Sequence, residues 1–129
     1  FIGSPAMNIM PVTVKETGAV TTVSLVDGKS VIVPISTETG ANGKSASFGV
    51  RPEDLTIATG EDYLFEGKVS IVEALGEVTL LYIEGLSAKE PIIAKLPGII
   101  DVKRGDTMRF SADRQKLHLF DADGQTYRR

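Results

Sequence analysis

Gly43, Lys44 and Ser45 reproduce the end of the nucleotide phosphate-binding loop G-x-x-x-x-G-K-[ST]. In such a loop, backbone N–H groups and the lysine hold the phosphates, and the first glycine would stand at position 38. That position holds Glu38, whose carboxylate repels a phosphate, and residues 46–51 have the pattern of a strand instead of the helix that should follow. The sequence therefore predicts an ordinary polar loop here.

The other possible metal ligands stand alone in the sequence. His118 is the single histidine and lies between two leucines, without a second histidine or a carboxylate beside it. Asp121 and Asp123 resemble the start of a calcium loop, but the glutamate that closes such a loop is missing. We expect His118 to be a structural or surface residue and residues 121–124 to form a tight turn.

Residues for covalent or acid–base catalysis are equally scattered. The chain has no cysteine, which excludes a thiolate nucleophile and a disulfide, and it has no G-x-S-x-G serine motif. The adjacent acids at 53–54 and 61–62 lie in polar, turn-like stretches. We therefore expect this chain itself to have no enzymatic activity and to bind no cofactor or metal.

The composition predicts a single domain, spanning residues 1–129, with enough apolar material for a core, because 42% of the residues are hydrophobic. Fourteen basic and 17 acidic residues give a net charge of −3, so nucleic acid is not an expected partner. No apolar run approaches the roughly 20 residues that span a bilayer. The absence of cysteine favours the cytosol, and the start at Phe1, without a methionine or a leader, predicts that the chain belongs to a longer protein.

The elements that must position these residues have the patterns of β-strands. Asp27-Gly28 is a strong hairpin signal between two apolar runs, and Pro52-Glu53-Asp54-Leu55 has the composition of one short helical turn. We expect Phe65, Val69 and Ile71 on one face of a strand, with a bulge near residues 72–73. The expected strands are 7–14 with a proline near an edge, 20–26, 29–35, 46–51, 65–71, 78–84, 91–96, 107–112 and 116–120, with a loop at 37–44.

No window of a dozen residues keeps a helical period of 3.6, and no repeat of 20 to 50 residues recurs. The chain is therefore predicted to be all-β. Strands of this number and spacing favour a small barrel or sandwich, because closure of a sheet removes its exposed edges.

Four ordered stretches of the sequence together resemble one known family, the transport-associated OB (TOBE) regulatory domains. Such domains form the C-terminal part of the ATP-binding subunit of carbohydrate ABC importers of the maltose and glycerol-3-phosphate type. The resemblance covers residues 1–127. It is carried by Phe1-Ile2-Gly3-Ser4-Pro5-Ala6-Met7-Asn8, Gly49-Val50-Arg51-Pro52-Glu53-Asp54-Leu55, Val72-Glu73-Ala74-Leu75-Gly76 with Leu81-Tyr82, and Lys116-Leu117-His118-Leu119-Phe120-Asp121 with Gly124. One departure is Val78, where the family often has an acid two residues after the Leu-Gly pair.

The resemblance implies an all-β, OB-type barrel with extra strands, Greek-key-like connections and short 3-10 turns. It also implies that residues 1–8 form the junction with an ATPase domain that is absent from this chain and that holds ATP and Mg²⁺. The implied role is regulation and dimerisation, with a homodimer, the importer's membrane subunits and a regulatory protein as partners. The full-length protein is then expected at the cytoplasmic face of the cell membrane, as a peripheral protein.

Within the family motif, Gly49, Arg51 and Glu53 are the candidate regulatory contact, because two of them are charged and lie on a turn. One other interpretation stays open at these positions: Gly49 and Pro52 only shape a corner, and Arg51 forms a local ion pair with Glu53.

A different function is a ligand-binding OB module for an oxyanion or an oligosaccharide. Such a surface needs stacked aromatic residues or converging donors. The eight aromatic residues are spread along the sequence, and the closest pair, Tyr63 and Phe65, lies outside any basic cluster.

Overall fold

The computed structural model describes residues 7–88 and 90–127, and it confirms the all-β prediction. The described residues form ten strands and three 3-10 turns and contain no helix long or apolar enough to cross a bilayer. The strands are β1 Asn8–Glu16, β2 Thr21–Leu25, β3 Ser30–Val33, β4 Ser45–Val50, β5 Thr56–Ala58, β6 Phe65–Ala74, β7 Val78–Glu84, β8 Ile92–Pro97, β9 Thr107–Ser111 and β10 His118–Phe120. The 3-10 turns are η1 Thr39–Ala41, η2 Pro52–Asp54 and η3 Arg114–Lys116.

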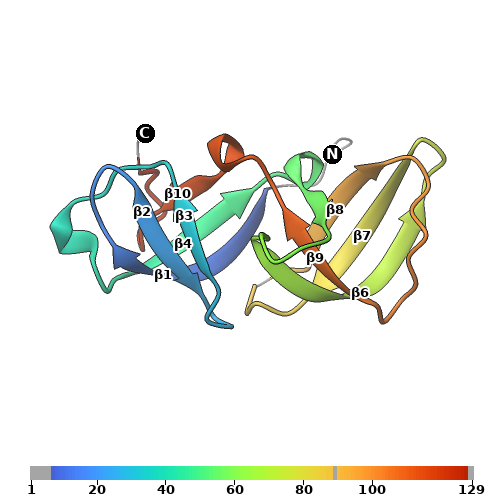
Figure 1. Cartoon of the computed structure of the whole chain (residues 1–129), viewed down its shortest axis with the longest axis horizontal. Helices are drawn as coiled ribbons and strands as arrows, with labels where there is room; N and C mark the ends of the chain where they lie inside the picture. Colours follow the sequence, from blue (N-terminus) through green and yellow to red (C-terminus); the bar gives the residue numbers. More distant parts are fainter. Residues whose placement is uncertain (1–6, 89, 128–129) are drawn as a thin grey trace.

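The strands form two five-stranded antiparallel sheets, which lie side by side along the long axis of the molecule (Figure 1). Sheet one has the order β10-β4-β1-β2-β3, and sheet two has the order β5-β9-β6-β7-β8. In each sheet a fourth strand returns beside the first strand of a three-strand meander, which is the Greek-key arrangement. The predicted Greek-key connections are therefore present, and they occur twice.

The two halves of the chain are built alike and exchange one strand each. Strand β4 is followed by η2 and then β5, which pairs with β9 of the other sheet. Strand β9 is followed by η3 and then β10, which pairs with β4. The equivalent elements lie about 60 residues apart, which is beyond the 20 to 50 residues over which a sequence repeat was expected to show. Each sheet therefore contains a strand from the other half of the chain.

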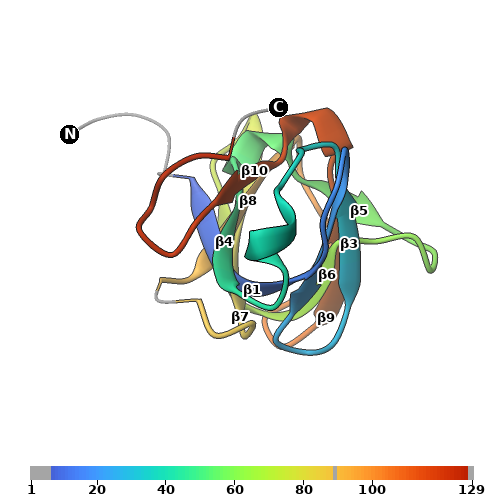
Figure 2. The same cartoon turned by 90° about the vertical axis from the view of Figure 1, so that its left-hand side faces the viewer.

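Seen from its end, sheet one curls around η1, whose Ala41 is buried (Figure 2). This turn lies inside the segment that was predicted to be only a loop. The Asp27-Gly28 hairpin is confirmed between β2 and β3, where Gly28 has a φ of +92° that a glycine adopts without strain. Strand β1 is the middle strand of sheet one, but its pairing with β2 begins only at Val12, so Pro11 lies where β4 alone flanks it.

The bulge in β6 lies earlier than the sequence predicted. The register with β7 shifts between Val69 and Ile71, so the alternation of side chains reverses there and not at residues 72–73. Phe65 and Val69 are buried as expected, but Ile71 is 51% exposed. The expectation that Ile71 shares their face was wrong, because the extra residue of the bulge turns it outward.

The apolar side chains buried in the two sheets form one continuous cluster. Its largest fully buried members include Phe48 in sheet one and the pair Phe65 and Phe110 in sheet two, whose rings stack with centroids 5.4 Å apart. Full burial of a phenylalanine contributes roughly 1.5 to 3 kcal/mol. Because both sheets contribute to this one cluster, the core fixes the position of each sheet relative to the other.

Candidate functional site

Gly49 lies on the outer face of sheet one, beneath a group of partly exposed apolar side chains. In the strand register, Gly49 lies between Ile9 on β1 and His118 on β10. The next row across the same strands contains Pro11, Ser47 and Phe120. We call this surface the Gly49 patch, and it consists of Met7, Ile9, Pro11, Ser47, Gly49, His118 and Phe120.

The absence of a side chain at Gly49 allows its neighbours to pack directly on the backbone. A Cβ atom at this position would lie 2.6 Å from Met7 Sδ and 2.9 Å from Phe120 Cε2. The Phe120 ring in turn stacks on His118, with ring centroids 6.4 Å apart. Gly49 therefore has a shaping role in the patch, and His118 is one of the partly buried residues that form it.

Arg51 and Glu53 lie at one end of this patch. Arg51 follows β4 in an extended conformation and is exposed, and Glu53 is exposed within η2. Pro52 between them is buried and occupies the first position of η2, so it fixes the direction of the chain. None of the three ion pairs among residues 7–88 and 90–127 involves Arg51 or Glu53, so the local ion pair considered above does not form.

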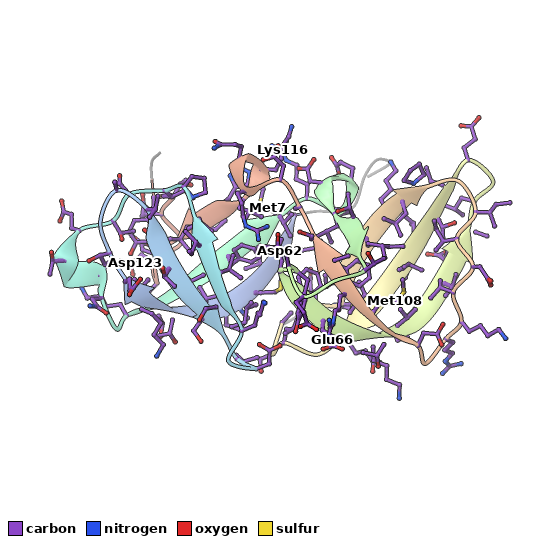
Figure 3. All side chains as sticks on the ribbon, viewed as in Figure 1. Met7, Asp62, Glu66, Met108, Lys116 and Asp123 are labelled. Atoms are coloured by element: carbon purple, nitrogen blue, oxygen red, sulfur yellow. The ribbon has the colours of Figure 1, made fainter. Side chains whose placement is uncertain are left out.

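A groove of about 440 Å³ borders the Gly49 patch, between β1 and the segment that leads into β8. Figure 3 places Met7, one of its lining residues, near the middle of the long axis, where the two sheets adjoin. The groove is lined mostly by apolar and neutral side chains, and Glu90 is the one charged residue among its described lining residues. The described part of this lining therefore presents an acid and no cation to a bound molecule, and an acid repels an oxyanion.

Asn8 joins the two sheets at the floor of this groove. Its Nδ2 donates to the carbonyl oxygen of Ile93 at 2.8 Å, and its Oδ1 accepts from the Ile93 N–H at 2.8 Å. The side-chain amide thus pairs with the free edge of β8 as a neighbouring strand would. Asn8 is only 5% exposed, so this pair of hydrogen bonds is shielded from water.

A second junction between the sheets centres on Tyr63, in the loop between β5 and β6. Lys29 Nζ lies 4.1 Å from the centre of the Tyr63 ring, and Arg109 Cζ lies 4.5 Å from it. Arg109 also pairs with Glu61 at 3.5 Å and with Glu66 at 3.9 Å. Tyr63 therefore lies beside two basic residues, although no basic residue is near it in the sequence. The fold brings Lys29 to it from the turn between β2 and β3, and Arg109 from β9.

The remaining candidate motifs have structural roles. The loop that ends with Gly43-Lys44-Ser45 leads into β4, which confirms the expected strand, and Gly43 N–H donates to the Val14 carbonyl. Asp121 Oδ1 accepts from the backbone N–H groups of Asp123 and Gln125, which confirms the expected tight turn. Within the described part of the chain, no three histidine, cysteine or acidic residues lie close enough to hold a metal ion.

Tyr127 borders a second, more open hollow with Lys44 and Glu38. Burial raises the pKa of the Tyr127 phenol above its ordinary value of 10.0, and the negative charge of Asp121 adds to this effect. Its backbone N–H donates to the Leu119 carbonyl at 2.8 Å. Tyr127 is therefore a neutral, structural residue at ordinary pH.

Comparison with known proteins identifies relatives across the whole chain. Residues 3–55 match the family model of the MalK OB fold domain, and residues 48–120 match that of the TOBE domain. The alpha-glucoside transport ATP-binding protein AglK of Rhizobium meliloti (strain 1021) is 66% identical over 128 residues, which are 99% of this chain and 35% of AglK. The maltose/maltodextrin import ATP-binding protein MalK of Vibrio cholerae is 38% identical over 131 residues, which are 100% of this chain and 35% of that protein. The chain thus spans about a third of the length of these relatives.

Among solved structures, the fold is similar to the cytoplasmic molybdate-binding protein ModG with molybdate bound. The TM-score is 0.61 and the sequence identity is 16%, with 92% of this chain and 96% of that chain covered. This likeness confirms the OB-like architecture.

Proposed function

Because this chain belongs to the TOBE family and carries both the MalK OB fold and TOBE domains, we propose that it regulates and pairs the ATP-binding subunits of a sugar ABC import system. The observation that carries this proposal is the 66% identity to AglK over 99% of the chain. AglK is named for the transport of alpha-glucosides, and maltose, which gives the MalK relatives their name, is itself an α-glucoside. An α-linked glucoside is therefore the sugar class that we propose for the parent importer.

In this proposal the ATPase domain lies outside the chain and binds ATP and Mg²⁺, and the parent protein works with membrane subunits at the cytoplasmic face of the membrane. Two ATPase domains must open and close around ATP. Paired regulatory domains keep the two ATPase domains at a high effective concentration while they are apart. The domain then acts as a fixed anchor while the ATPase domains move.

Regulation follows from the same pairing. A regulatory protein that binds the domain better in the open state of the subunits shifts the population toward that state and slows transport. The end of the Gly49 patch is the contact that we propose for this protein, because Arg51 and Glu53 are exposed there without an ion-pair partner among the described residues. Such charges can pair with a binding protein without first breaking an internal contact.

The test is Glu53→Lys in the full-length transporter. Replacement of an exposed turn residue changes the free energy of unfolding by less than about 0.5 kcal/mol, so the variant should fold normally. We expect ATP-driven uptake of the α-glucoside to persist while its inhibition by the regulator is lost. Glu16→Lys is the matched control, because Glu16 is an exposed acid at the opposite end of β1, and this variant should keep its regulation.

Two outcomes would contradict the proposed contact. A Glu53→Lys chain that melts well below the parent would make Glu53 a structural residue. A variant transporter whose regulation is unchanged would place the contact elsewhere.

A further inference from the structure

Asn42 is the only asparagine of the chain that is followed by a glycine. The one other asparagine, Asn8, is followed by Ile9. Asparagine is a thermolabile residue, because the nitrogen of the next residue can attack the carbon of its side-chain amide. Glycine leaves that nitrogen open to approach, since it carries no side chain. The sequence therefore brings an attacking nitrogen and a reactive amide together at Asn42 and Gly43.

The structure places these two residues on an exposed turn between η1 and β4. Asn42 has a φ of −59° and a ψ of 129°, and Gly43 has a φ of +82°. The Lys44 N–H donates to the Ala41 carbonyl at 3.0 Å, so these four residues form a type II turn. Figure 1 shows η1 at the end of the molecule that lies away from sheet two. Water therefore has access to the Asn42 amide.

The same turn restrains the reaction. At a ψ of 129° the Gly43 nitrogen lies on the side of the Asn42 Hα and away from the side chain, so ring closure needs rotation about the Asn42 Cα–C bond. The Gly43 N–H also donates to the Val14 carbonyl at 2.8 Å, which engages the attacking nitrogen. The ring therefore closes only when the loop separates from β1. Exposed loops open in this way at a low free energy.

Asn8 has none of the features that make Asn42 reactive. It lies in β1 and is only 5% exposed. Both polar atoms of its amide are hydrogen-bonded to Ile93, and the branched side chain of Ile9 shields the nitrogen that would attack. Asn8 is therefore an internal reference for Asn42 within the same chain.

We propose that Asn42 is a self-modification site, at which the folded chain slowly converts its own asparagine. The Gly43 nitrogen bonds to Cγ of Asn42, and the bond between Cγ and the side-chain nitrogen breaks. The proton of the Gly43 nitrogen leaves with that side-chain nitrogen as ammonia, and a succinimide ring remains. Water then opens the ring at either carbonyl. One opening gives aspartate, and the other gives isoaspartate, in which the main chain runs through the former side chain.

Isoaspartate changes the junction between the loop and β1. It adds one carbon to the main chain just before Gly43, whose N–H bonds to the Val14 carbonyl. The Val14 N–H in turn donates to the Lys44 carbonyl at 3.0 Å, and both bonds continue the pairing of β1 with β4. A longer main chain cannot keep both bonds and the turn. The product also adds a carboxylate beside Lys44, which lines the open hollow with Glu38. The conversion therefore loosens this end of sheet one.

The first experiment keeps the folded chain at mildly alkaline pH and physiological temperature and follows each asparagine by tandem mass spectrometry. The Asn42 peptide should gain the mass of an amide that has become an acid, while the Asn8 peptide should not change. Asp27-Gly28 and Asp123-Gly124 can form the same ring, but its opening restores their mass, so they do not interfere. A folded chain whose Asn42 keeps its amide, or whose Asn8 converts as fast, would overturn the proposal.

The same incubation in guanidinium chloride measures the restraint by the fold. Unfolding removes the type II turn and the hydrogen bond from Gly43 to Val14. Asn42 should then convert about tenfold faster, which corresponds to an opening free energy of roughly 1.4 kcal/mol in the folded chain. Equal rates in the folded and unfolded chains would contradict the restraint assigned to the turn.

The second experiment detects the isoaspartyl product with a carboxyl methyltransferase that is specific for isoaspartate. This enzyme moves a methyl group from the sulfonium of S-adenosylmethionine to the new carboxylate, so a labelled methyl group reports the product. Asn42→Gln is the matched control, because it keeps the amide but needs a less favourable six-membered ring. After the same incubation this variant should take up far less label than the parent. Equal label in the two chains would overturn Asn42 as the site.

A third measurement separates the longer main chain from the added charge. Freshly prepared Asn42→Asp carries the carboxylate on an ordinary main chain, so its midpoint of unfolding in urea should match the parent. The isoaspartyl chain, separated by ion exchange, should unfold at a lower urea concentration. An isoaspartyl chain with the midpoint of the parent, or an equal fall in Asn42→Asp, would contradict the loosening of sheet one by the longer main chain.

Discussion

Removal of the Asn8 side chain should weaken the junction between the two sheets, because this buried amide bonds to the backbone of β8. Asn8 makes two hydrogen bonds of 2.8 Å to the backbone of Ile93, and no buried side-chain polar atom in the described residues lacks a partner. Two such bonds contribute roughly 1 to 3 kcal/mol together. Because Asn8 is 5% exposed, water replaces them poorly in Asn8→Ala, and the partners left unpaired raise the total to about 2 to 4 kcal/mol.

A loss of this size is a large share of the roughly 5 to 15 kcal/mol by which a domain is stable. Urea unfolding followed by circular dichroism should show a lower midpoint with an unchanged slope, since the surface exposed on unfolding hardly changes. Asn42→Ala is the control, because Asn42 is the other asparagine of the chain and is exposed. An Asn8→Ala chain within about 0.5 kcal/mol of the parent would refute the role of this amide.

Asn8→Asp separates the donor from the acceptor. An ionised aspartate still accepts from the Ile93 N–H but presents negative charge to the Ile93 carbonyl in a buried site, whereas a protonated aspartate can donate to that carbonyl. The folded state therefore favours the protonated form and raises the pKa of this carboxyl above the usual value of about 3.9. The contribution of the protonated acid is present below about pH 4 and is lost as the pH rises, so the variant should approach the parent at low pH and fall behind it at pH 7.

Three further predictions concern other sites. Gly67→Ala should lower the free energy of unfolding by about 1 to 3 kcal/mol, because the added Cβ would lie 2.3 Å from Cγ2 of the buried Ile83. Urea titration measures this loss. Gly40→Ala is the control and should change little, because no atom lies within 4 Å of a Cβ added there. The hydrogen bond to Glu73, followed by burial and the Glu73 charge, raises the pKa of Tyr82 above 10.0, so this bond stabilises the fold below pH 10 and is lost as the pH rises through the Tyr82 pKa. Tyr82→Phe should therefore reduce the alkaline loss of stability, as followed by circular dichroism, and an unchanged alkaline midpoint would contradict this. Isothermal calorimetry of the isolated chain should detect no saturable binding of ATP at micromolar concentration, because the loop before β4 leads into a strand and lacks a helix N-terminus for the phosphates.

Features that depend on neighbouring residues could be predicted from the sequence. The Asp27-Gly28 turn and the Pro52 turn form where their backbone preferences indicate, because each conformation is decided within four residues. The tight turn at residues 121–124 follows from the same local chemistry. The family motif also located Gly49, whose packing explains why a glycine stands there.

Features that depend on contacts between distant residues could not be predicted. Asn8 and Ile93 are 85 positions apart, and Lys29 meets Tyr63 only because two turns from different sheets adjoin. The short strand β5 carries little apolar pattern of its own and forms because β9 offers it an edge. The position of the bulge was predicted wrongly because the apolar alternation in the sequence continues through Ile71, whereas the register already shifts between Val69 and Ile71.

The exchange of β5 and β10 also sets the order in which the chain can finish folding during its synthesis. Strand β4 is complete at Val50, but the strand that covers its outer edge, β10, begins only at His118. At 5 to 20 residues per second, about 70 further residues take the ribosome roughly 4 to 14 s. During that interval β4 presents an open edge that can pair with another nascent chain. Slow translation of the segment between β4 and β10 should therefore lower the soluble yield, and a chaperone that shields strand edges should restore it.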